Sequence, residues 1–79
     1  MPDQTVLWQQ VETIKRRVQA ELGPKPPREF RSTFAYQNYA AMCGEAFWAH
    51  KTDELDENIL RLLQESAEKA IETWKAKKG

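Results

Sequence analysis

The chain has 79 residues with 12 Lys or Arg and 12 Asp or Glu, which gives a formal net charge of zero at pH 7. This length has room for one domain with a modest core, and the charge balance removes the simplest argument for nucleic-acid or membrane-surface binding. A single cysteine, Cys43, excludes an intramolecular disulfide. The sequence shows no secretory signal and no apolar run near the ~20 residues of a membrane span. We therefore expect one cytoplasmic domain over residues 1–79, without membrane contact.

The first predicted element is a helix over about residues 4–22. Asp3 or Thr5 can cap its start, and Gly23 followed by proline is typical of a helix end. One helical face carries apolar residues at intervals of three or four, namely Leu7, Val11, Ile14, Val18 and Leu22. Residues 23–27 (GPKPP) then predict a short, stiff connection.

The middle segment predicts a second helix over about residues 30–50, starting between Pro27 and Thr33, with Ser32 as one candidate cap. On a helical wheel its apolar residues form two clusters with Gly44 between them. One cluster contains Phe30, Phe34, Ala41 and Trp48, and the other contains Tyr36, Ala40, Cys43 and Phe47. The apolar arc is thus much wider than the ~100° stripe that a surface helix needs.

The third predicted helix covers about residues 53–77, with Thr52 as a candidate cap. Four carboxylates at its start and lysines at its end complement the helix dipole. Its apolar face consists of Leu60, Leu63, Ala67, Ala70 and Trp74, widened by Leu55, Ile59, Leu62 and Ile71. No segment shows the alternation of a strand. The sequence therefore predicts an all-α, small three-helix bundle, in which the third helix is antiparallel to the second and the first packs across both.

The wide apolar arc of the middle helix has three interpretations. A compact bundle could enclose it, a second copy could cover it in a homodimer, or a different protein could bind there. Small side chains at Ala40, Ala41 and Gly44 would let another backbone come close. The candidate protein-binding residues are Phe34, Tyr36, Tyr39, Phe47 and Trp48, with Arg28 and Arg31 at the rim.

Catalysis and metal binding have little support in the sequence. His50 is the only histidine, and Cys43 lies two helical turns before it, about 10 Å away along a helix axis. The sequence has no calcium loop, zinc motif, phosphate loop or nucleophile elbow. We therefore expect a protein that is not an enzyme, with no catalytic residues, metal, cofactor or small-molecule substrate.

Nucleic-acid binding is the alternative function. Six cations fall within 17 residues, namely Lys15, Arg16, Arg17, Lys25, Arg28 and Arg31, and aromatic residues follow them closely. A helix-turn-helix is disfavoured because the first connection is long and proline-rich. A third helix that begins with carboxylates would also be repelled by phosphate.

These observations favour a protein-interaction module that acts as an adaptor, inhibitor or regulator. Its size is typical of small bacterial or phage proteins that act by occluding another protein. We expect it to bury its aromatic helix face against itself or a protein partner, where a few large side chains would dominate the binding energy.

Overall fold

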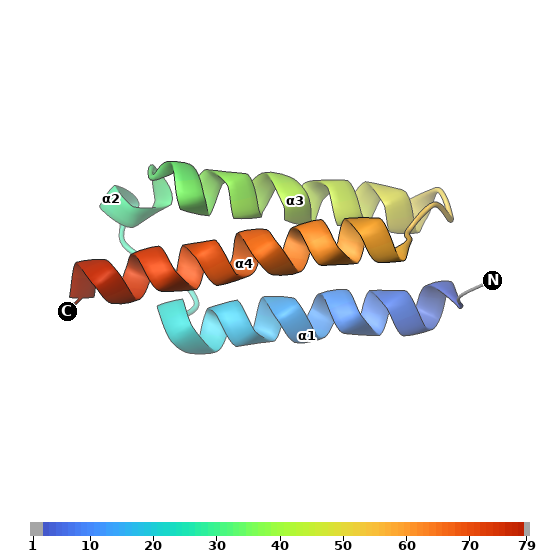
Figure 1. The fold of residues 1–79 in the computed structure, drawn as a ribbon, viewed down its shortest axis with the longest axis horizontal. Helices are drawn as coiled ribbons and strands as arrows, with labels where there is room; N and C mark the ends of the chain where they lie inside the picture. Colours follow the sequence, from blue (N-terminus) through green and yellow to red (C-terminus); the bar gives the residue numbers. More distant parts are fainter. Residues whose placement is uncertain (1–2, 79) are drawn as a thin grey trace.

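The computed structural model describes residues 3–78, which form helices and connecting segments without a strand. The helices are α1 (Gln4–Leu22), α2 (Arg28–Arg31), α3 (Phe34–Lys51) and α4 (Glu57–Lys78). The three long helices lie side by side in a rod of 42 × 18 × 18 Å, with α3 antiparallel to α1 and α4 (Figure 1). The predicted all-α class is therefore confirmed, as is the antiparallel pairing of the last two long helices. Within residues 3–78, no helix is long and apolar enough to cross a membrane.

Helix α4 packs against both α1 and α3, whereas α1 and α3 contact each other much less. The first helix was expected to pack across both other long helices. Helix α1 does so mainly through its contact with α4. The core joins the predicted apolar faces of the long helices. Its buried members on α1 and α4 are Leu7, Val11, Val18, Leu22, Leu60, Leu63, Ala67, Ala70 and Ile71. Leu62, which was expected to widen the α4 face, is instead 48% exposed.

The prediction of one helix over residues 30–50 is wrong. The middle segment forms two helices, which are separated at Ser32 and Thr33. The Thr33 hydroxyl donates to the Phe30 carbonyl at 2.7 Å and accepts from the Tyr36 amide at 3.3 Å. Thr33, and not Ser32, is therefore the N-cap of α3. Ser and Thr hydroxyls compete with helical hydrogen bonds in this way, which explains why α2 ends after four residues.

The fourth helix begins at Glu57, and not at residue 53 as predicted. The Asp56 carboxylate accepts from the Ile59 amide at 2.9 Å and so caps the new helix. Thr52, the predicted cap, instead ends α3, where its amide donates to the Trp48 carbonyl at 3.1 Å. Helix α3 ends with a Schellman motif, in which Asp53 has a left-handed φ of 58°. The turn between α3 and α4 is therefore longer than the sequence suggested.

Candidate interaction surface

The side of α3 that faces away from the bundle is rich in aromatic residues. Phe34 is 84% exposed, Trp48 68% and Phe47 49%. At about 100° per residue, the exposed positions of α3 cover half of the helix, opposite Tyr39, Ala46 and Ala49 in the core. We call this half the α3 outer face, which consists of Phe34, Gln37, Asn38, Ala40, Ala41, Gly44, Glu45, Phe47, Trp48 and Lys51. The bundle itself therefore leaves much of the wide apolar arc uncovered.

The five aromatic candidates from the sequence divide into two environments. Phe34, Phe47 and Trp48 lie on the α3 outer face, but Tyr39 is only 7% exposed and belongs to the core. Tyr36 is half-buried and packs against that core. The difference arises because positions 36 and 39 turn toward α1 and α4. A partner on the outer face would thus meet three of the five rings directly.

Small residues occupy the middle of the α3 outer face, between Phe34 at one end and Trp48 at the other. Ala40, Ala41 and Gly44 are all exposed. A Cβ atom built on Gly44 would meet nothing within 4 Å, so packing within the chain does not require glycine there. Glycine inside a helix costs about 0.8–1 kcal/mol relative to alanine. The fold of a single chain offers no compensation for this cost.

The basic residues are spread over α1, the connection and α2. Lys15 lies 6.0 Å from the centre of the Trp8 ring, and Arg17 contacts Glu68 at 3.4 Å. Arg28 and Arg31 are exposed on α2, next to the N-terminal end of the α3 outer face, and Arg16 and Lys25 are exposed elsewhere. Two of the six cations are thus already engaged with other side chains of the chain.

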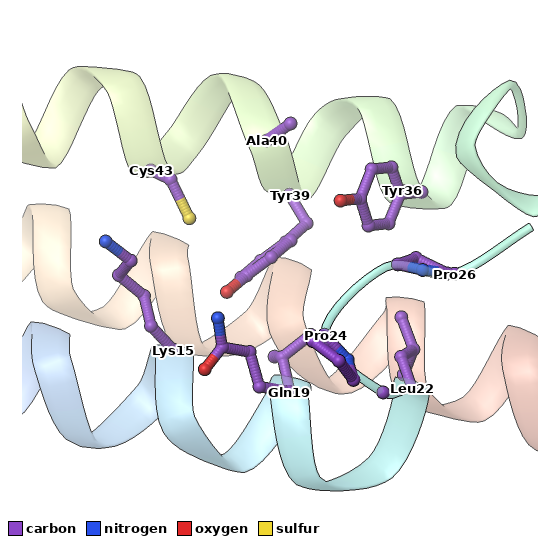
Figure 2. A pocket seen from close by; sticks show the side chains of 11 residues that line it. Lys15, Gln19, Leu22, Pro24, Pro26, Tyr36, Tyr39, Ala40 and Cys43 are labelled. Atoms are coloured by element: carbon purple, nitrogen blue, oxygen red, sulfur yellow. The ribbon is translucent and has the colours of Figure 1, made fainter. Parts of the chain in front are cut away.

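A cavity of about 250 Å³ opens between the C-terminal half of α1, the proline connection and α3 (Figure 2). Lys15 and Gln19 extend from α1 toward Tyr39 and Cys43 on α3, and Pro24 and Pro26 border the cavity at its other end. Helices α1 and α3 each pack on α4 and contact each other much less. Ala40 lines the cavity and also belongs to the α3 outer face, so the two features are neighbours.

The acidic groups at this cavity are held in their neutral forms. Burial raises the pKa of Tyr39 far above its ordinary value, and the hydrogen bond that its hydroxyl shares with Cys43 adds to the effect. Burial also raises the pKa of the Cys43 thiol, although this hydrogen bond and the Lys15 charge oppose the shift. Nucleophilic cysteine chemistry requires a thiolate. At neutral pH Cys43 is therefore a protonated thiol at the edge of the core.

The other candidate for proton transfer, His50, belongs to an aromatic cluster. Its ring stacks on Trp8 with centroids 4.5 Å apart and an interplanar angle of 14°. Phe47 contacts the same Trp8 ring at a centroid distance of 6.2 Å. Among the described residues, no group of three His, Cys, Asp or Glu side chains converges on a position suited to a metal ion. His50 thus packs the end of α3 against α1.

Comparison with known proteins gives no relative from which a function could be transferred. The chain matches no protein family, no curated protein and no solved structure.

Proposed function

We propose that this protein is a non-enzymatic interaction module that binds a protein through the α3 outer face. The exposed rings of Phe34, Phe47 and Trp48 carry this proposal. An exposed aromatic residue presents about 150–250 Å² of surface, so these three rings leave about 400 Å² in contact with water. Together with the small residues between them, they form a patch as large as the largest apolar patch of a typical monomeric protein, which is often functional.

The polar surroundings of this patch support the same function. Binding interfaces combine a core of aromatic anchors with a charged or polar rim. Here Arg28 and Arg31 lie at one end of the α3 outer face, and Asn38 and Glu45 lie along one edge. The α3 outer face thus has aromatic anchors, a centre of small residues and a polar rim, from which a role as adaptor, inhibitor or regulator would follow.

Site-specific photo-crosslinking in the source cells tests this function. A photoreactive phenylalanine analogue replaces Trp48, whose side chain is exposed and whose replacement leaves the core intact. The matched control carries the same analogue at Gln10, which is exposed at the groove between α1 and α4. We expect discrete adducts from position 48 and none from position 10, with their partners identified by mass spectrometry.

Two further results would test whether the α3 outer face binds a protein. The adducts should disappear when Phe34→Ser is added to the position-48 protein, because the partner would lose a second anchor. Equal labelling at positions 48 and 10, or none at either position, would contradict an interaction role for this surface.

Nucleic-acid binding has weaker support. The basic residues include Lys15 beside Trp8 and Arg17 beside Glu68, and they are divided among three parts of the chain. Titration with a generic duplex over a salt series tests this alternative, because phosphate contacts lose affinity steeply as salt increases. We expect no salt-dependent binding.

A further inference from the structure

A regular pattern runs along the α3 outer face. Phe34, Ala41 and Trp48 recur every seven residues, and Gln37, Gly44 and Lys51 do the same three residues later. All six are exposed. This alternation of three and four is the spacing by which one helix packs along another in a coiled coil. We call these six residues the α3 seam.

We propose that the α3 seam pairs with the same seam of a second copy, antiparallel, about a two-fold axis. This inference rests on the proposed function and names the partner as another copy of this chain. The first support is the match between the two seams. When two such helices run antiparallel, each of Phe34, Ala41 and Trp48 on one copy meets one of Gln37, Gly44 and Lys51 on the other copy. In the central layer of facing residues, Ala41 of the first copy meets Gly44 of the second copy. The two-fold axis repeats this contact, so that Gly44 of the first copy also meets Ala41 of the second copy.

The outer layers of this arrangement pair each large ring with a long polar side chain. Gln37 meets Trp48 of the second copy, and Phe34 meets Lys51 of the second copy. Consecutive layers place Phe34 of one copy beside Trp48 of the other at both ends of the interface. The centre therefore has small residues where the backbones are closest, and the large rings flank it.

Avoidance of contacts between like charges favours the antiparallel orientation. A parallel pair would place the two Lys51 side chains against each other and align the two helix dipoles. In the antiparallel pair, each Lys51 meets a phenylalanine ring, a contact that already occurs within the chain, where Lys51 lies 5.3 Å from the centre of the Phe47 ring. Along the edge of the seam, Glu45 faces Asn38 of the second copy and not another carboxylate.

The area available is sufficient for a small, specific dimer. If the rings of Phe34, Phe47 and Trp48 were covered on both copies, about 800 Å² of aromatic surface would leave water. Gln37, Ala41, Gly44 and Lys51 on each copy would bring the total close to ~1,200 Å², the lower end of the range for stable interfaces. An interface confined to α3 thus reaches the lower end of the sizes of specific interfaces.

Gly44 gives the sharpest test, because its two expected effects are opposite in sign. In a monomer, Gly44→Ala should raise the melting temperature, since alanine favours the helix and its Cβ enters open space. In the dimer, the same Cβ would separate the two backbones. We expect sedimentation equilibrium to show a mass of twice 9.2 kDa for the wild-type chain at micromolar concentrations. Gly44→Ala should raise the dissociation constant of the dimer at least tenfold.

A matched pair of bulky substitutions controls for changes in fold. Ala41→Leu adds its bulk at the centre of the seam and should leave the protein monomeric with unchanged helicity. Ala20→Leu adds the same bulk to an exposed position of α1 and should leave the dimer intact. If both variants have the same oligomeric state as the wild type, the seam is not the interface.

The orientation can be measured with spin labels. In a Cys43→Ser background, Lys51→Cys carries a nitroxide near one end of the seam. The antiparallel arrangement places positions 51 of the two copies 17 residues apart along the helices, so that the labels should be about 25 Å apart. A label separation near 10 Å would indicate parallel pairing and overturn the proposal.

The dimer and the broader function can fail separately. A strictly monomeric mass at millimolar concentration, together with hetero-partner adducts at position 48, would overturn the dimer and leave the proposed function standing. A monomeric mass without any adducts would overturn both.

Discussion

The rings of Phe30 and Trp74 meet edge to face, with their centroids 5.0 Å apart and their planes at 71°. This contact joins the short helix α2 to the C-terminal part of α4, and Tyr36 adds a second edge contact to Phe30 at 5.7 Å. Phe30 is 2% exposed, although Phe34, only four residues later, is 84% exposed. The break at Thr33 therefore assigns the first ring to the core and the second to the surface.

Phe30→Ala should be strongly destabilising. Loss of a buried phenylalanine costs about 3–5 kcal/mol, and a domain of this size has a total stability of roughly 4–12 kcal/mol. We expect urea denaturation, followed by circular dichroism, to show a free energy of unfolding that is lower than the wild-type value by about 3–5 kcal/mol. Phe34→Ala is the control, because its exposed ring should contribute less than about 0.5 kcal/mol to the free energy of unfolding of the monomer. Similar losses for both variants would contradict the division between core and surface.

Gln4 fastens the start of α1 to the turn between α3 and α4. Its Nε2 donates to the Leu55 carbonyl at 2.8 Å, and its Oε1 accepts from the Leu55 amide at 3.3 Å. Gln4→Ala should lower the free energy of unfolding by about 1–2 kcal/mol, because both backbone groups of a buried residue lose their partner. Gln9→Ala, at an exposed position of the same helix, should change it by less than about 0.5 kcal/mol. Equal effects in a denaturation experiment would show that the paired hydrogen bonds do not contribute.

Asp53→Gly should stabilise the protein. Asp53 has a φ of 58° at the end of α3, a conformation in which glycine has no steric penalty from a Cβ. We expect the free energy of unfolding to rise by roughly 0.5–1 kcal/mol, as measured by thermal and urea denaturation. Asp53→Ala retains the Cβ and lacks the polar group that helps Asp adopt this conformation, and it should show no gain. A lower melting temperature for the glycine variant would contradict this explanation.

Stability should decrease at alkaline pH. Burial raises the pKa values of Cys43 and Tyr39 above their ordinary values of 9.0 and 10.0. The unfolded chain therefore releases these protons at lower pH than the folded chain, and the free energy of unfolding falls as the pH rises above about 9. Well below pH 9 both groups are protonated in both states, and their contribution is constant.

Denaturation at pH 7, 9 and 10.5 measures this dependence. The double variant Tyr39→Phe with Cys43→Ala lacks both titrating groups, so its stability should fall less between pH 9 and 10.5 than that of the wild type. The slope with pH is the relevant quantity, because the double variant also loses a hydrogen bond. Identical slopes for the two proteins would show that these groups titrate alike in the folded and unfolded chains.

Local apolar spacing was enough to predict the helical class and most of the core. Apart from Leu62, the predicted apolar positions from Leu7 to Leu22 and from Leu60 to Ile71 lie in or against the core, because regular spacing over many residues has one strong physical solution, an amphipathic helix. The excess of apolar residues on the middle helix was also evident from the wheel. These features depend on local periodicity, which a single chain displays fully.

The start of the middle helix, and the choice of which of its rings remain outside the core, became visible only in the folded chain. The hydroxyl of Thr33 competes successfully with the helix, a choice between two capping residues that propensity alone does not resolve. Tyr39 and Trp48 have similar apolar character in the sequence. Their different environments follow from the positions of α1 and α4 around α3, and those positions depend on packing between residues far apart in the chain.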